Sequence, residues 1–202
     1  MQPTTKEQPE SARILPGDWL HPLPPECGFD SAQPLEIDLG AGKGRFLLAR
    51  AAHHPDVNFL GIERMLRRVR KLDRKVRHQG LRNVRLLRME AYYATTYLIP
   101  SGAVSTYYIF FPDPWPKKRH HGNRLFSPLF VDAMHRTLAS EGRVHIATDH
   151  RPYFEEIQEI LCQDPRFNRT EPYIPSEDEQ TDFECYYAQH TEICRCSIQR
   201  GT

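Results

Sequence analysis

The sequence contains little cysteine and no long hydrophobic run, and these two absences exclude several classes of protein. Its 202 residues include five cysteines, an odd number, and no apolar segment of the kind found in a secretory signal. A disulfide framework is therefore not expected, and a reducing cytoplasm is the expected location. No apolar stretch approaches the roughly 18 residues that a membrane-spanning helix needs. We expect a soluble protein with no membrane partner, and we expect it to act as a monomer.

The sequence also lacks a convincing set of metal ligands. Cys194 and Cys196 flank Arg195, but no second ligand pair occurs at a spacing that suits zinc. Buried small side chains are the simpler interpretation of these cysteines. No metal is predicted.

The formal net charge is only +1, yet the charges are unevenly distributed. Between Arg64 and Arg88 there are eleven Lys or Arg residues and a single acid, Asp73. The stretch from Glu171 to Glu184 is instead dominated by acids. A basic face is therefore expected, as in proteins that bind a polyanion, although a solvated helix surface also explains these charges.

Prolines divide the chain into an arm and a domain. Residues 1–33 contain six prolines, which disfavour both helix and sheet, so a flexible, extended N-terminal arm is predicted. The length of the chain suits one sizeable core. Residues 34–202 are therefore predicted to form a single catalytic domain.

From Leu35 onward, short apolar runs alternate with helical patterns. This alternation is typical of an α/β protein with a parallel sheet and helices on both of its faces. The last segment, Phe183–Gln189 followed by Glu192–Ile198, is predicted as an antiparallel hairpin added to the sheet. The other predicted strands are Leu35–Leu39, Val57–Ile62, Val84–Arg88, Val104–Phe110 and Arg143–Thr148, and the predicted helices are Phe46–Ala52, Met65–Val76, Phe126–Leu138 and Tyr153–Leu161.

A glycine-rich segment between Asp38 and Gly44 follows the first predicted strand and precedes a helix. Gly40, Gly42 and Gly44 allow a tight turn whose N–H groups approach a ligand closely. Glu63 ends the next strand, where a doubly wound sheet places a carboxylate against ribose hydroxyls. The spacing Gly-x-Gly-x-Gly favours S-adenosylmethionine over a dinucleotide, whose loop has Gly-x-Gly-x-x-Gly.

Two further acids are candidate contacts of this cofactor. Asp38 lies where a carboxylate would receive the amino group of the cofactor. Glu90 follows the third predicted strand and is placed to meet the adenine edge. A turn cap at Asp38 and an exposed strand-end acid at Glu90 are the structural alternatives.

A proline-rich turn follows the fourth predicted strand. Phe111-Pro112-Asp113-Pro114-Trp115-Pro116 leads into the basic run Lys117 to His121. Three prolines in five residues hold the backbone rigidly at the carboxyl end of a strand, where open parallel sheets bind their ligands. The turn is therefore predicted to present Asp113 and Trp115 at the site.

With these motifs, the chain resembles the bacterial tRNA (guanine-N7)-methyltransferases. The resemblance extends from Leu35 to Glu184 and rests on the glycine loop, on Gly61-Ile62-Glu63, on the turn and its basic run, on Thr148-Asp149 and on Thr181-Asp182-Phe183-Glu184. It implies a class I Rossmann-like methyltransferase fold with a seven-stranded, mostly parallel sheet. It also implies transfer of a methyl group from S-adenosylmethionine to N7 of a guanosine in the variable loop of tRNA.

The resemblance further implies roles for individual residues. Asp113 would be the catalytic residue and would also contact the cofactor, together with Asp38, Gly40, Gly42, Gly44, Glu63 and Glu90. The guanosine would be held by Lys117, Asp149, Thr181, Asp182, Phe183 and Glu184, and tRNA would be contacted by Lys118, Arg119, His120, His121 and Arg124.

Two other functions remain open from the residues. One is methylation of an amino nitrogen, although the turn of those enzymes usually ends in Pro-Pro-aromatic, whereas here Asp113 separates Pro112 from Pro114. The other is an RNA-binding paralogue without transfer activity, since Gly122 and Asn123 interrupt the basic run and Tyr186 stands where the family usually has an arginine. Guanine N7 carries a lone pair and no proton, so the expected reaction needs positioning rather than a general base.

Overall fold

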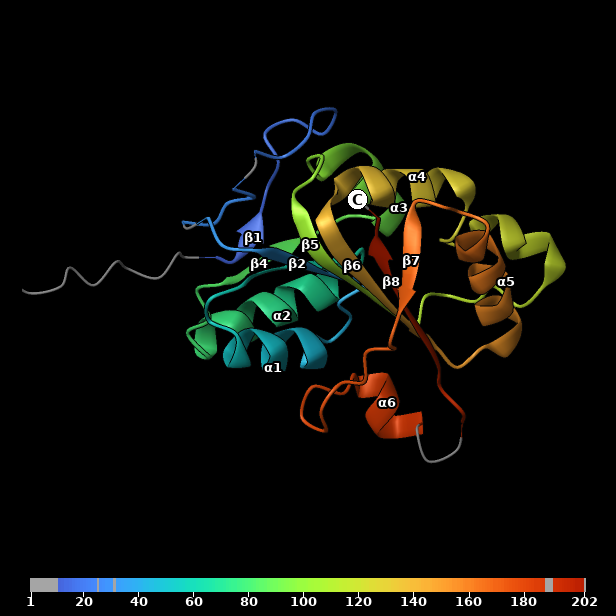
Figure 1. The fold of residues 1–202 in the computed structure, drawn as a ribbon. Coiled ribbons are helices and arrows are strands. Elements are labelled where there is room, and N and C mark those ends of the chain that lie inside the picture. Colours follow the sequence, from blue (N-terminus) through green and yellow to red (C-terminus); the bar gives the residue numbers. More distant parts are fainter. Residues whose placement is uncertain (1–10, 25, 31, 188–190, 202) are drawn as a thin grey trace, which may run out of the picture.

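An eight-stranded sheet organises the chain (Figure 1). The computed structural model describes residues 11–24, 26–30, 32–187 and 191–201. Within them the strand order is β1-β4-β3-β2-β5-β6-β8-β7, with β8 antiparallel to both of its neighbours and the other pairs parallel. The strands are β1 (Arg13–Ile14), β2 (Leu35–Leu39), β3 (Asn58–Ile62), β4 (Val84–Leu87), β5 (Val104–Phe110), β6 (Leu138–Thr148), β7 (Phe167–Thr170) and β8 (Cys194–Arg200).

Helices cover both faces of this sheet (Figure 1). α1 and α2 pack on one face around Phe59 and Leu86, and α4 and α5 pack on the other around Tyr107 and Ile146. The helices are α1 (Arg45–His53), α2 (Leu66–His78), α3 (Ala91–Tyr93), α4 (Pro128–Thr137), α5 (Arg151–Cys162) and α6 (Asp182–Tyr187), with a π-helical turn at Ala94–Leu98 and a 3₁₀ turn at Lys118–Asn123. Among the described residues, no helix is both long and apolar enough to cross a membrane.

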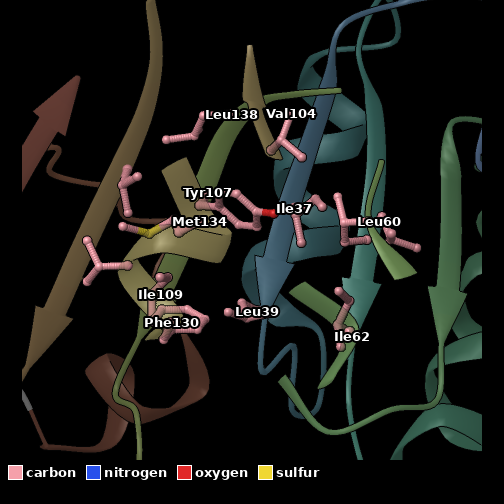
Figure 2. Close-up of a cluster of buried hydrophobic side chains, with 14 of the residues drawn as sticks. Ile37, Leu39, Leu60, Ile62, Val104, Tyr107, Ile109, Phe130, Met134 and Leu138 are labelled. Atoms are coloured by element: carbon pink, nitrogen blue, oxygen red, sulfur yellow. The ribbon is translucent and has the colours of Figure 1, made fainter. Parts of the chain in front are cut away.

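The alternation of side chains along β2 determines which residues enter the core. Ile37 and Leu39 lie on the face of the sheet covered by α4, beside Phe130 and Met134 (Figure 2). Since successive side chains of a strand point to opposite faces, Asp38 lies on the face of α1. β2 thus carries core residues on one face and polar residues on the other.

The five strands predicted before the C-terminal segment are present, and their ends agree with prediction within one residue, except that β6 begins at Leu138, five residues before the predicted Arg143. The four predicted helices correspond to α1, α2, α4 and α5. Apolar periodicity located these elements correctly because each long helix and each central strand buries one continuous set of apolar side chains. The edge strand β7 was not predicted, since only Phe167 of its four residues is buried.

The predicted hairpin is wrong in its first strand. The described part of Phe183–Gln189 belongs to helix α6, while Ala188 and Gln189 lie outside the described residues. A capping box begins this helix: the Glu184 N–H donates to Thr181 Oγ1 at 3.1 Å, and the Thr181 N–H donates to Glu184 Oε2 at 2.7 Å. The hairpin is formed instead by β7 and β8. The aromatic composition suggested a strand, but this local cap decides for a helix.

Part of the predicted N-terminal arm joins the domain. β1 pairs in parallel with β4, which raises the strand count to eight rather than the predicted seven. The Ala12 N–H donates to Asp73 Oδ1 of α2 at 2.8 Å. Leu23, Cys27 and Phe29 are buried. The prolines correctly indicated that helices are disfavoured here, but the apolar residues between them pack against the sheet.

Candidate active site

The candidate site lies at the carboxyl ends of β3, β2 and β5, which are neighbours in the sheet. From β2 the chain continues to β3 and β4, which lie on one side of β2 in the sheet. β5 lies on the other side of β2 and begins the second half of the sheet. This is a topological switch point, where open α/β sheets bind their ligands. The loop after β2 is tied to β3 because the Gly40 and Ala41 N–H groups donate to the Ile62 carbonyl at 2.8 and 3.0 Å.

The three glycines of this loop share a left-handed backbone conformation, but Gly40 and Gly44 differ in the space around them. All have positive φ, at 98° for Gly40, 57° for Gly42 and 79° for Gly44. A Cβ at Gly40 would meet no atom within 4 Å, whereas a Cβ at Gly44 would lie 2.2 Å from Leu72 Cδ1. Gly44 therefore permits close packing of the loop on α2, and Gly40 leaves open space beside its backbone.

Glu63 connects the glycine loop to the start of α2. Its Oε2 accepts from the Gly42 N–H at 3.1 Å, and its Oε1 accepts from the Met65 N–H at 2.8 Å. Arg68 Nη1 lies 3.4 Å from Oε2. The carboxylate is buried with these partners. Because a carboxylate offers about four acceptor positions, Glu63 retains capacity for a ligand hydroxyl.

Asp38 is a buried carboxylic acid at the end of β2. Its carboxyl group makes no hydrogen bond to another described residue, and burial together with nearby Glu63 raises its pKa to about 7. A buried carboxylate without a partner is costly unless a cation approaches it. The position of Asp38 therefore suits a positively charged group of a ligand.

Glu90 caps the short helix α3 and is exposed. Its carboxylate accepts from the Tyr92 and Tyr93 N–H groups, both at 2.9 Å. The sequence pattern could not distinguish this helix-capping role of Glu90 from a contact with the cofactor. Its predicted approach to an adenine edge stays a prediction.

The turn after β5 has two strained residues. Phe111 and Trp115 have φ values of 52° and 43°, which side-chain-bearing residues rarely adopt. The Phe111 N–H donates to the Ala147 carbonyl at 2.7 Å, so the turn is fastened to the end of β6. Asp113 is exposed, and its Oδ2 lies 4.0 Å from Arg64 Nη2. The predicted catalytic carboxylate therefore lies at the same edge as the glycine loop.

The basic run after this turn is mostly exposed, with one exception. Lys117, Lys118 and Arg119 are exposed, and His120 and His121 are half-buried. Arg124 is buried, with its Nε donating to the Pro114 carbonyl at 2.9 Å and its guanidinium paired with Glu156 of α5. A tRNA contact predicted for Arg124 does not fit this burial. The sequence could not distinguish Arg124 from the exposed basic residues beside it, because its partner Glu156 lies far along the chain.

Apart from Lys117, the residues predicted to hold guanosine come from two segments near this edge. Asp149 follows β6 and is half-buried. Phe183 of α6 stacks on Phe111 with ring centroids 4.4 Å apart, so the Thr181–Glu184 segment lies against the turn. Glu184 is only 1% exposed and is paired with Arg195 of β8. The structure thus brings α6 to the turn.

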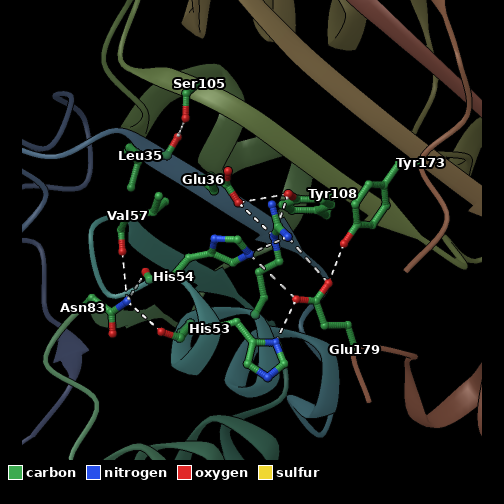
Figure 3. A network of polar contacts seen from close by, with 12 residues as sticks. Leu35, Glu36, His53, His54, Val57, Asn83, Ser105, Tyr108, Tyr173 and Glu179 are labelled. Atoms are coloured by element: carbon green, nitrogen blue, oxygen red, sulfur yellow. Dashed lines mark hydrogen bonds and ion pairs between the residues drawn. The ribbon is translucent and has the colours of Figure 1, made fainter. Parts of the chain in front are cut away.

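A polar network holds the chain just before α6 against α1 (Figure 3). Glu179 lies 3.6 Å from Arg50 and 3.2 Å from His53, and it accepts a hydrogen bond from the Tyr173 hydroxyl at 2.6 Å. Arg45 donates to the Gln180 carbonyl at 3.0 Å. These residues were not predicted from the sequence. No spacing pattern identifies their contacts, since every partner except Tyr173 lies more than 100 residues away along the chain.

The exposed surface of α2 is strongly basic. Val69, Leu72 and Val76 face the core, and the buried Asp73 accepts from Ala12 and pairs with Arg77. The remaining basic side chains point away from the core: Arg64, Arg67, Arg68, Arg70, Lys71, Arg74, Lys75 and Arg77 are exposed. This helix begins at the candidate site and extends its positive charge along the surface.

The chain is similar in sequence to a methyltransferase family and to several tRNA methyltransferases. The family described as “Putative methyltransferase” matches residues 32–192. The tRNA (guanine-N(7)-)-methyltransferase of Chromohalobacter salexigens is 35% identical over 155 residues, covering 74% of this chain and 63% of the relative. The enzyme of that name from Staphylococcus saprophyticus is 35% identical over 160 residues, covering 79% of this chain and 75% of the relative. The chain spans less than two thirds of several relatives, including 56% of that from Nitrosococcus oceani.

Solved structures with the same fold are more distant in sequence. The 16S rRNA methyltransferase KamB has a TM-score of 0.64 and 14% identity, over 88% of this chain and 91% of KamB. A Streptococcus mutans protein crystallised in complex with SAH has a TM-score of 0.57 and 12% identity, over 85% of this chain and 90% of that protein. The predicted Rossmann-like methyltransferase fold is confirmed.

Proposed function

The chain belongs to the tRNA (guanine-N(7)-)-methyltransferase family, and we propose that it transfers a methyl group from S-adenosylmethionine to N7 of a guanosine in tRNA. The observation that carries the proposal is the meeting of three features at one sheet edge. These are the glycine loop, the carboxylates Asp38 and Glu63, and the turn that bears Asp113. The chain is expected to act as a monomer in the cytoplasm.

The residues at the site fit S-adenosylmethionine. Gly40 leaves space beside its backbone for the amino acid part of the cofactor. Asp38 has a buried carboxyl without a hydrogen-bond partner among the described residues, which suits the amino group of the cofactor. Glu63 is rigidly held and suits the ribose hydroxyls, and Glu90 would approach the adenine. When bound, the cofactor supplies an electrophilic methyl group.

The protein's contribution to the reaction is mainly positioning. Guanine N7 has an in-plane lone pair and no proton, so no residue has to remove one. The reacting atoms have to lie in line and roughly 3 to 3.5 Å apart. Asp113 is in place to orient the cofactor and the base at the reacting edge, and Asp149 and Glu184 are suited to accept from the guanine N1–H and amine. These carboxylates favour the positive charge that develops on the ring.

Two basic surfaces flank this edge and suit the tRNA backbone. One is the exposed run Lys117, Lys118 and Arg119 with the adjoining histidines His120 and His121, of which Lys117 lies nearest to the turn and is proposed to reach the guanosine itself. The other is the outer face of α2. The remaining substrate contacts are proposed for Thr181, Asp182 and Phe183. The target base has to leave its stacked position to reach the site, and aromatic side chains such as Phe183 offer it a face.

The decisive experiment is incubation of the protein with labelled S-adenosylmethionine and unmodified tRNA, followed by nucleoside analysis. The expected labelled product is 7-methylguanosine. A labelled amino-methylated nucleoside would favour the amino-nitrogen alternative. Cofactor binding by calorimetry without any labelled nucleoside would favour an RNA-binding protein that has lost transfer.

A further inference from the structure

Arg195 of β8 forms an ion pair with Glu184 beneath α6. Its Nη2 donates to Glu184 Oε1, and the other carboxylate oxygen accepts from the Thr181 N–H at 2.7 Å. β8 pairs with β6 so that Arg195 is opposite Ala147, two residues before Asp149. Arg195 therefore lies between the two segments that we propose hold the guanosine.

The second terminal nitrogen of this guanidinium has no hydrogen-bond partner among the described residues. Arg195 Nη1 is buried and makes no hydrogen bond within the described part of the chain. The only other such side-chain atoms there are the hydroxyl oxygens of Thr95 and Thr96. A charged donor that is buried and unpaired is unfavourable, so the position calls for an acceptor that the described chain does not supply.

The Glu184–Arg195 pair presents an acceptor directly beside a free donor. A guanine base carries the complementary pattern on one edge, with the acceptor O6 beside the donor N1–H. Adenine has an amino group where guanine has O6, so its amine, a donor, would face the donor Arg195 Nη1. The carboxylate keeps two further acceptor positions after its contacts with Arg195 and Thr181.

We propose that Arg195 recognises O6 of the target guanine through Nη1 while Glu184 accepts from N1–H, so that this pair selects guanine over adenine. The proposal rests on the proposed function and names a specificity-determining residue for it. With O6 and N1–H held in this way, N7 on the adjacent edge stays free for the methyl donor. Arg195 lies outside every motif on which the family resemblance rests.

A base reaches this pair only when the side chains that cover it move aside. Glu184 is 1% exposed and the Arg195 side chain is 15% exposed. Because Glu184 belongs to α6 and Arg195 to β8, the movement that admits a base has to leave their ion pair closed.

The test compares tRNAs that carry guanosine, 6-thioguanosine or inosine at the methylated position. 6-Thioguanosine keeps N1–H and N7 but replaces O6 with a weaker acceptor, whereas inosine keeps O6 and lacks the exocyclic amine. For the unaltered protein we expect kcat/KM to fall about tenfold with 6-thioguanosine. In Arg195→Met, guanosine itself should be methylated about tenfold more slowly, and 6-thioguanosine should cause no further loss. The inosine effect should be the same in both proteins.

Several results would overturn the proposal without ambiguity. Equal methylation rates on guanosine and 6-thioguanosine in the unaltered protein would overturn it without any variant. The proposal would also be overturned if 6-thioguanosine lowered kcat/KM in Arg195→Met as much as in the unaltered protein, provided that calorimetry shows normal cofactor binding. If that variant does not fold, Arg195→Lys replaces it, since lysine retains a cation beside Glu184 but lacks the forked pair of donors. Failure of the proposed function is distinct, because the unaltered protein would then form no 7-methylguanosine from guanosine.

Discussion

Arg64 Nη2 and Asp113 Oδ2 lie 4.0 Å apart and join the loop after β3 to the turn after β5. β2 lies between these two strands, so the ion pair extends across the edge where the glycine loop emerges. Both side chains are mostly exposed, at 65% and 71%. An exposed pair of this kind contributes little to stability and is easily exchanged for a ligand. The Asp113 carboxylate can therefore contact a ligand without a large loss of stability.

The first prediction concerns Asp113→Ala. The variant should fold normally and lose methyl transfer by about 100-fold or more, because misplaced reactants lose most of the advantage of alignment. Nucleoside analysis of the product and thermal unfolding measure the two effects. Arg64→Ala is the matched control, since it removes the same ion pair but should change the rate far less. Full activity of Asp113→Ala would refute the role of this carboxylate.

The second prediction follows from the pKa of Asp38, which burial and the neighbouring Glu63 raise from 3.8 to about 7. Between about pH 4 and about pH 7 the unfolded chain has an ionised Asp38, whereas the folded protein retains the proton. Because the folded state binds more protons there, this group lowers the free energy of unfolding as pH rises through the range. Denaturant titrations at several pH values should show that the free energy of unfolding declines less with rising pH in Asp38→Asn than in the unaltered protein.

The same group should make cofactor binding dependent on pH. An ionised Asp38 attracts the cofactor's amino group, so affinity should fall by up to about tenfold for each pH unit below 7. Calorimetry between about pH 5 and about pH 7 measures this, since an α-amino group stays protonated there. Asp38→Asn should bind weakly with little pH dependence. An equal slope in both proteins would assign the titration to another residue.

The third prediction separates two glycines of one loop. In Gly44→Ala the added carbon would lie 2.2 Å from Leu72 Cδ1 at a φ of 79°, so the free energy of unfolding should fall by about 1–3 kcal/mol. In Gly40→Ala no atom lies within 4 Å, and the main effect should be loss of cofactor affinity. Gly102→Ala is the control for strain alone, since it has positive φ and open space but lies before β5, away from the site.

The fourth prediction concerns the exposed basic run. Lys117→Ala and Arg119→Ala should each weaken tRNA binding and reduce the slope of log affinity against log salt by about one, because each removes one positive charge from the surface that faces the polyanionic RNA. Filter binding across a range of salt concentrations measures the slope. Arg143→Ala is the control, since Arg143 is exposed and paired with Thr106 near the start of β5, at the opposite end of the sheet. Unchanged slopes in both test variants would move the RNA surface elsewhere.

The fifth prediction concerns the network around Glu179. Glu179→Gln removes a buried charge that contacts Arg50, His53 and Tyr173, and it should lower the free energy of unfolding by about 1–3 kcal/mol. Because Thr181 follows two residues later, the KM for tRNA should also rise. Asp178→Asn is the matched control, since Asp178 also pairs with His53 but is 61% exposed, so its replacement should change stability far less. Equal effects of the two variants would argue against a positioning role for Glu179.

Local patterns in the sequence were sufficient for the central elements of the fold. The apolar positions of α2 recur at helical spacing, and Ile37 and Leu39 alternate with polar residues along β2. The glycine loop and Glu63 were also recognisable, since their spacing follows from the distance between two adjacent strands. These features depend on neighbours within a short stretch of chain, so the sequence alone determined them.

Contacts between distant segments required the tertiary structure. Arg124 belongs to a basic run, yet burial against Glu156 removes it from the surface. Glu184 forms a local capping box with Thr181, but its ion pair with Arg195, which joins α6 to β8, links segments that the sequence does not connect. Composition and spacing carry little information about such pairs, because packing of the whole sheet decides which side chains meet. The sequence by itself therefore determined the family and the glycine loop, whereas only the tertiary structure decided which charged residues are exposed at the candidate site and which are buried in ion pairs.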